Sequence, residues 1–174
     1  KIAEPYFLRY PPADWFLPNI AYMLPQWVCE SYRERDYELI LQISQVDEAY
    51  ERIFHASTHP PIESAILALH HPIFLQPYVE LFKMSADFFS FREKLVEQEP
   101  SFWEHNDFPE LSTEKPACFF ALYRLQRGIQ YRELSEAQYL LLSSFKKGTT
   151  IEEACASIEQ KPGLAEEAAQ GISS

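Results

Sequence analysis

Glycine is scarce in this sequence, with only four residues among 174, and thirteen prolines outnumber it. Phosphate-binding loops need glycine where the backbone closely approaches the ligand, and neither G-x-G-x-x-G nor G-x-x-x-x-G-K-[ST] occurs. The G-x-S-x-G turn that exposes a nucleophilic serine in many hydrolases is also missing. The sequence therefore carries no signature of nucleotide binding or of serine hydrolysis.

Basic residues are also few compared with acidic ones. Lysine and arginine total 15 against 26 acidic residues, which gives a formal net charge of −11, and the longest basic run is Lys146-Lys147. Nucleic-acid binding draws most of its affinity from cations that neutralise phosphates, so this composition disfavours it. An acidic surface fits a basic partner or solubility alone.

Cysteines are few, and long apolar runs are missing. Cys29, Cys118 and Cys155 lie far apart without a C-x-x-C, so we expect no disulfide framework and a reducing compartment, the cytoplasm. Cys118 and Cys155 lie among apolar neighbours and are predicted to be buried as small hydrophobic side chains. No apolar run reaches the 18 residues of a membrane span, and the first residues do not resemble a signal peptide.

The histidines do not form a metal-binding pattern. His55 and His59 are four residues apart, but no glutamate follows His55, and Pro60-Pro61 breaks the helix there. A protein metal site needs three or four converging ligands. His70-His71 precede Pro72 and suit a helix end, where imidazoles meet free carbonyls. We therefore predict no metal ligand, no cofactor and no catalytic residue in this chain.

Helical patterns dominate the first part of the chain. The clearest helix is predicted at 37–56, where one apolar stripe recurs at spacings of three and four; it consists of Leu39, Ile43, Val46, Tyr50 and Ile53. Residues 16–35 are expected to be helical in two pieces divided at Pro25, and 63–69 to form a short helix. The proline-rich residues 1–13 are predicted to be extended.

Short β-prone runs follow. Residues 78–84 are predicted to form a strand, 86–98 a helix and 99–116 a loop. The run 118–126 is apolar on both faces, which indicates an inner strand. After a turn at Arg127-Gly128, residues 129–134 are predicted to return as a second strand.

The last part of the chain has clear helix signals. Ser135 with Gln138, and Thr150 with Glu153, form capping boxes. The first box predicts a helix that runs from residue 136 through Lys147, with Gly148 as the residue after its end. The second predicts a helix from residue 151 through about Gln160. A third helix is expected at 163–170. The pattern predicts an α+β fold: a helical region at 1–75 and a small antiparallel sheet with C-terminal hairpin and helices at 76–174, together one compact unit.

The order of these segments resembles a bacterial family, the HvfC/BufC-type proteins, formerly described as DNA-binding domains. The resemblance is carried by Tyr10-Pro11-Pro12, Leu17–Trp27, Gln45–Tyr50, Leu67–His70, the strand at 78–84, Leu122-Tyr123-Arg124, Tyr131, Leu134, Ala137, Leu140-Leu141, Gly148 and Glu153-Ala154. It covers the family's second half, so we expect a fragment that lacks the N-terminal helical domain. The stretch Glu30–Tyr37 is longer than the family pattern.

The resemblance implies a function. Such proteins are typically encoded beside multinuclear non-haem iron enzymes and help them to modify ribosomally made precursor peptides, often at cysteines. The iron and the chemistry belong to the enzyme. The resemblance thus implies a non-catalytic partner protein.

Residues 118–170 also resemble small winged-helix modules that recognise peptide leaders. These modules accept the peptide as an added strand, held by backbone hydrogen bonds and selected by alternate side-chain pockets. A peptide is then expected along Ile129–Leu134 or a neighbouring strand. Its expected contacts are Arg124, Arg127, Arg132 and Tyr131. Taken singly, each arginine is more simply explained as an ordinary solvated strand residue.

The alternative is the C-terminal domain of a DNA-binding regulator. A helix that enters a DNA groove should be basic, but the helix predicted at 149–160 carries Glu152, Glu153 and Glu159 and no lysine or arginine. A stand-alone enzyme has the least support, because no catalytic grouping stands out.

Overall fold

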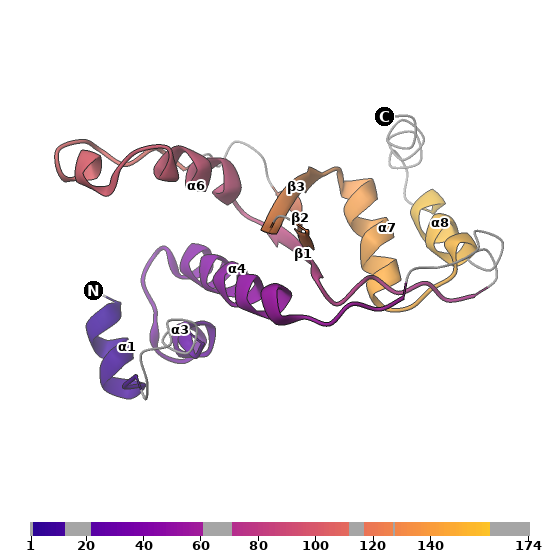
Figure 1. The fold of residues 1–174 in the computed structure, drawn as a ribbon, viewed down its shortest axis with the longest axis horizontal. Coiled ribbons are helices and arrows are strands. Elements are labelled where there is room, and N and C mark those ends of the chain that lie inside the picture. The colour runs from indigo at the N-terminus through magenta and orange to yellow at the C-terminus, as the bar shows by residue number, and fades with distance from the viewer. Residues whose placement is uncertain (1, 13–21, 61–70, 112–116, 127, 161–174) are drawn as a thin grey trace. The chain divides into compact units, whose positions relative to one another are not determined.

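A computed structural model describes residues 2–12, 22–60, 71–111, 117–126 and 128–160 (Figure 1). The chain divides into two compact units, Lys1–His55 and Ala56–Ser174, here called the N-terminal and C-terminal units. The described ranges contain six α-helices and one three-stranded antiparallel sheet. The predicted α+β class with a helical N-terminal half is confirmed. No helix in these ranges is long and apolar enough to cross a membrane.

The described part of the N-terminal unit is helical, with α1 (Ala3–Arg9), α3 (Leu24–Ser31) and α4 (Tyr37–His55). Its core is formed by the buried side chains of Tyr6, Trp27 and Val28, against which Ile40 and Leu41 of α4 pack. The rings of Tyr6 and Trp27 meet edge to face with their centroids 6.0 Å apart, a favourable aromatic geometry. Aromatic residues therefore hold α1 to α3.

The extended segment predicted at 1–13 is wrong, because Ala3–Arg9 is helical. Pro5 lies in the first turn, where the backbone N–H that proline lacks would have no acceptor within the helix. Burial of Tyr6 stabilises the helix, and Pro11-Pro12 follow only after it has ended. Pro25 likewise lies in the first turn of α3, which confirms the predicted restart there. Of the residues predicted to be helical at 16–35, those at 16–21 lie outside the described residues, and α3 ends at Ser31, before the predicted end.

Helix α4 confirms the helix predicted at 37–56. Val46, Ala49 and Ile53 are fully buried, and their spacings of three and four place them on one stripe. The other members of the predicted stripe, Leu39, Ile43 and Tyr50, are half-buried. The apolar periodicity of the sequence thus located both the helix and its packed side.

The sheet of the C-terminal unit has the order β1-β2-β3, with β1 (Val79–Met84), β2 (Cys118–Leu125) and β3 (Gly128–Leu134). Both pairings are antiparallel, and β2 is central, as its apolar character on both faces predicted. Leu125 pairs with Gly128 across a two-residue loop. Gly128 has a φ of +129°, a conformation that favours glycine.

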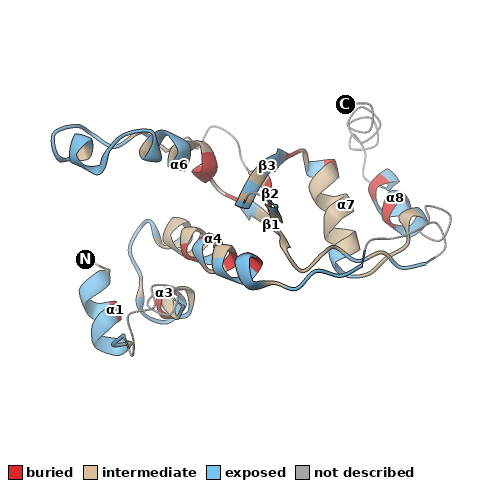
Figure 2. Cartoon of the chain, viewed as in Figure 1, coloured by how far each residue is buried: buried red, intermediate tan, exposed pale blue. Residues whose placement is uncertain are grey.

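Helices pack on both faces of this sheet: α6 (Phe88–Val96) on one, and α7 (Glu136–Lys146) on the other, followed by α8 (Ile151–Glu159). Phe89 of α6 meets Phe120 with ring centroids 4.7 Å apart, whereas Tyr139 of α7 meets Phe119 at 4.9 Å. Successive strand residues point to opposite faces, so α6 and α7 cover opposite sides. Figure 2 shows buried residues at the start of α6, in the sheet and on α8.

The helices of the C-terminal unit lie close to their predicted positions. The predicted helices at 86–98, at 136–147 and at 151–160 are confirmed, with ends one or two residues away. The predicted loop at 99–116 is partly wrong, because Pro100–Glu104 forms a short 3₁₀ helix, η1, with Pro100 in its first turn. The helices predicted at 63–69 and 163–170 lie outside the described residues.

Candidate functional site

Two capping boxes position the helices that border the candidate site. The Ser135 hydroxyl accepts from the N–H of Gln138 at 3.2 Å, and the N–H of Ser135 donates to the Gln138 side chain at 3.0 Å. Thr150 and Glu153 repeat this arrangement at 3.2 and 3.0 Å. Each box satisfies N–H groups that the first helical turn leaves without an acceptor. Helix α7 therefore begins directly after β3, and α8 begins at a defined residue.

A hollow of about 710 Å³ lies on the α7 side of the sheet. Ligand pockets in proteins commonly enclose roughly 300–1,000 Å³, so the hollow is large enough for several side chains of a peptide. Strands, α7 and α8 all contribute to its walls. Most of the lining is apolar, and six of its side chains are Val79, Ala121, Leu134, Leu141, Leu142 and Ile158.

Three charged side chains also line the hollow: Arg124, Arg132 and Glu159. Arg132 and Glu159 are exposed, so their charges are in water at the edge of an apolar surface. The guanidinium of Arg132 makes no hydrogen bond or ion pair with any other described residue. It is therefore available to a carboxylate of a ligand, to which arginine can donate two parallel hydrogen bonds.

Arg124 has a structural contact of its own. Its Nη2 donates to the backbone carbonyl oxygen of Ala56 at 2.7 Å, and its guanidinium lies 5.3 Å from the centre of the Tyr78 ring. It is half-buried. These contacts hold the start of the C-terminal unit against β2, so Arg124 serves the fold as well as lining the hollow.

The other two predicted contact residues are placed differently. Tyr131 stacks on Phe89 with ring centroids 4.5 Å apart and lies 6.2 Å from Phe120. These contacts put Tyr131 on the α6 side of the sheet, away from the hollow. Arg127 lies outside the described residues. Of the four residues predicted from the sequence, the structure therefore brings only Arg124 and Arg132 to the hollow.

Cys155 was missed by sequence reasoning. Its predicted burial is wrong, because the thiol-bearing side chain is exposed and lines the hollow. Its neighbour Ala154 and the later Ile158 take the buried positions of α8, and a step of one residue rotates a helix by about 100°. The predicted burial of Cys118 is confirmed.

Metal-ligating residues do not gather in the described part of the chain. Among these residues, no group of three or more histidine, cysteine, aspartate or glutamate side chains could hold a metal ion. Nε2 of His55 lies 3.9 Å from Oε2 of Glu51, one turn earlier in the same helix. The backbone N–H and carbonyl of His59 are bonded to the Gln76 amide at 2.9 and 3.0 Å, and His59 comes after α4 has ended.

No family model and no curated protein matches this chain.

Proposed function

We propose that this chain is a non-catalytic partner protein that binds a ribosomal precursor peptide and presents it to an iron-dependent modifying enzyme. The observation that supports this most is the apolar hollow of about 710 Å³ with the exposed Arg132 at its edge. The resemblance to HvfC/BufC-type proteins supplies the peptide and the enzyme as the partners. Catalysis and iron are assigned to the enzyme.

The hollow suits a short stretch of extended peptide. Side chains of an extended chain alternate between two directions, so every second apolar residue of a leader can enter the hollow. A leader carboxylate can pair with Arg132 at the edge. The strand order puts β1 and β3 at the two edges of the sheet, which is where an added peptide strand pairs in related binding modes.

Two variants of α8 test the site. Cys155→Trp places a large side chain in the hollow, while Ala156→Trp places the same side chain on the neighbouring exposed position, which is not part of the lining. Titration calorimetry with the precursor peptide encoded beside this gene should show at least about tenfold weaker binding for Cys155→Trp, because one blocked pocket is commonly worth 1–3 kcal/mol or so. Ala156→Trp should bind like the wild type.

The same titration, repeated with the neighbouring iron enzyme present, tests the wider proposal. We expect a complex of three components, in which the peptide contacts both proteins. If no neighbouring precursor peptide binds even when the enzyme is present, the proposed function is wrong. Equal weakening by both tryptophan variants would instead reject the hollow as the site.

A further inference from the structure

A second surface lies on the arm formed by α6, η1 and the chain as far as residue 111. Large apolar side chains are exposed there: Val96 is 62% exposed and Phe108 63% exposed. Contiguous exposed apolar surface in a soluble protein commonly marks a contact with another molecule. This arm belongs to the C-terminal unit but shares no lining residue with the hollow described above.

The exposed side chains border a groove of about 590 Å³. One wall is aromatic, since Trp103 stacks on Phe108 with ring centroids 5.5 Å apart. The indole N–H donates to the carbonyl of Leu95 at 3.1 Å, which fixes the plane of the ring. The groove therefore presents an aromatic surface whose orientation is set before any partner binds.

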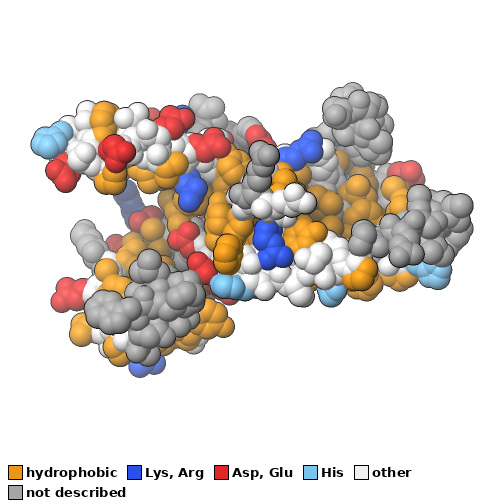
Figure 3. Space-filling model, in the orientation of Figure 1, with side chains coloured by type: hydrophobic (Ala, Val, Ile, Leu, Met, Phe, Trp, Pro, Cys, Tyr) orange, Lys and Arg blue, Asp and Glu red, His pale blue; other side chains and the backbone are white. Residues whose placement is uncertain are grey.

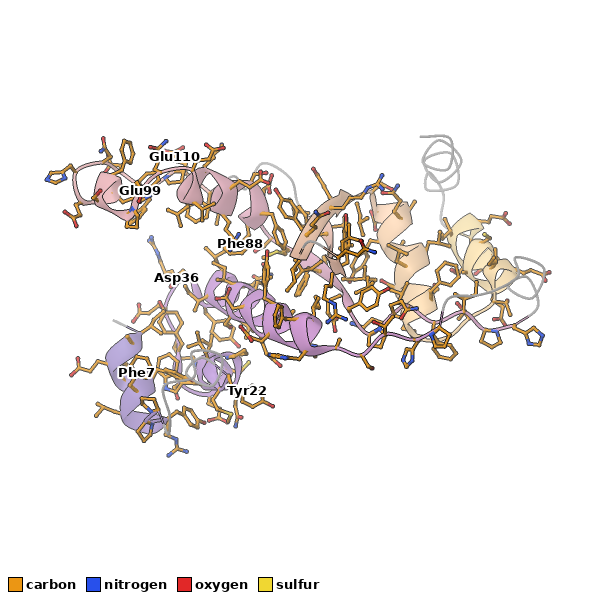
Figure 4. All side chains as sticks on the ribbon, in the orientation of Figure 1. Phe7, Tyr22, Asp36, Phe88, Glu99 and Glu110 are labelled. Carbon is orange, nitrogen blue, oxygen red and sulfur yellow. The ribbon has the colours of Figure 1, made fainter. Side chains whose placement is uncertain are left out.

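The lining of the groove also carries acidic side chains. Glu97 and Glu99 line it, both are exposed, and neither forms an ion pair with another described residue. Residues 95–111 contain five carboxylates and no lysine or arginine. Figure 3 shows acidic and hydrophobic side chains interspersed on this arm, and Figure 4 places Glu99 and Glu110 along it.

We propose that this groove docks a segment of a partner protein that carries arginine or lysine next to an apolar residue. The apolar residue packs on Val96 and Phe108. The cation lies over the aromatic wall, where it is attracted to the ring face, and pairs with Glu97 or Glu99. An uncharged apolar segment would leave two carboxylates partly desolvated without a partner, so charge complementarity selects a basic one. This surface does not depend on the proposed peptide function of the hollow.

Nuclear magnetic resonance of the ¹⁵N-labelled full chain tests this proposal with defined probes. The first is an acetylated and amidated heptapeptide that contains two arginines and two leucines. The second has both arginines replaced by glutamine. The first should shift the indole N–H of Trp103 and the amides of Leu95 and Val96 in a saturable way, and the second should shift them far less. Trp103→Phe identifies the indole signal.

Two double variants separate the groove from general acidity. Glu97→Gln/Glu99→Gln should weaken binding of the arginine peptide at least about fivefold, because it removes the paired charges. Glu104→Gln/Glu110→Gln removes the same charge from the same arm but outside the groove, and should change affinity less than about twofold. Equal effects of the two variants, equal shifts by both peptides, no saturable shift, or shifts centred on Leu141 and Ile158 would each overturn the proposal.

Discussion

Arg124 of β2 and Arg132 of β3 both line the hollow but have different contacts. Arg124 donates to the carbonyl of Ala56 and lies over Tyr78, whereas the guanidinium of Arg132 contacts no hydrogen-bonding or charged partner among the described residues. The hydrogen bond of Arg124 is charge-assisted, and such bonds are the stronger ones. Two arginines that look alike in the sequence are therefore expected to differ in their effect on stability.

Arg124→Met should lower the free energy of unfolding by about 1–3 kcal/mol, because it leaves the Ala56 carbonyl without its donor. Arg132→Met, the matched control, should change it by no more than about 0.5 kcal/mol. Urea denaturation followed by circular dichroism measures both. Equal stabilities for the two variants would show that the Ala56 contact does not matter for the fold.

Glu153 is a second residue with a defined role. Its carboxylate accepts from the N–H of Thr150 and then from the Thr150 hydroxyl, and these bonds hold the pKa of Glu153 below its ordinary value. The pKa of a glutamate in the unfolded chain is about 4.3. Because the pKa of Glu153 is lower in the folded chain, its carboxylate stabilises the fold at pH values above that unfolded pKa. That stabilisation is lost as the pH falls through the lowered value.

The expected result is a pH-dependent difference between the wild type and Glu153→Gln. The wild type should be the more stable of the two at neutral pH, and this advantage should shrink as the pH falls below about 4.3. Carboxyl carbon shifts of Glu153, recorded over the same pH range, give its pKa directly. An advantage that stays constant down to pH ~2 would exclude the capping carboxylate as its source.

Helix α7 is closely followed by a glycine, which no other residue can replace without strain. Gly148 has a φ of +78°, and a Cβ placed there would lie 2.3 Å from Cε1 of the Phe74 ring. Its N–H donates to the carbonyl of Phe145 at 3.2 Å, and the N–H of Leu75 reaches the same carbonyl. The end of α7 and the chain that leads into β1 are thus joined at one point.

Gly148→Ala should therefore destabilise the chain by more than about 1 kcal/mol, since backbone strain and the contact with Phe74 add together. Gly128→Ala is the matched control, because Gly128 also has a positive φ but a Cβ there meets nothing within 4 Å. Thermal unfolding should rank the wild type first, Gly128→Ala second and Gly148→Ala third. A reversed order of the two variants would mean that Phe74 moves away at little cost.

The sequence predicted most elements of the described chain, because local signals specify them. Capping boxes at Ser135 and Thr150, the glycine at 148 and the apolar stripe of α4 all act within a few residues of the chain. The prediction failed at α1, where the local cost of Pro5 is small and burial of Tyr6 decides the structure. Proline counts alone could not reveal that packing.

The candidate site was far less predictable. The sequence predicted that arginines of the hairpin bind the peptide. It could not show that Arg124 donates a hydrogen bond to the Ala56 carbonyl, or that Tyr131 faces α6. The hollow is made by segments far apart along the chain, from Leu75 to Glu159, and such long-range placement has no local pattern. Helical phase could have indicated that Cys155 lies off the buried stripe of Ala154 and Ile158.

The C-terminal unit carries two concave surfaces with different charged groups. The C-terminal unit offers an apolar hollow edged by a cation and, on another arm, an aromatic groove edged by carboxylates. Because the two surfaces differ in charge, we expect them to favour different ligands. A protein that brings a peptide and another protein together needs two such surfaces, and this agrees with the proposed role beside an enzyme.

Alkylation of Cys155 tests the peptide site most directly. Cys155 lines the hollow and is exposed, Cys29 is exposed in the N-terminal unit, and Cys118 is buried. Mass spectrometry can follow the reaction of each thiol with N-ethylmaleimide, with and without saturating precursor peptide. We predict that the peptide slows the reaction of Cys155 several-fold and leaves that of Cys29 unchanged. A peptide that binds in calorimetry yet leaves the rate at Cys155 unchanged would contradict the account.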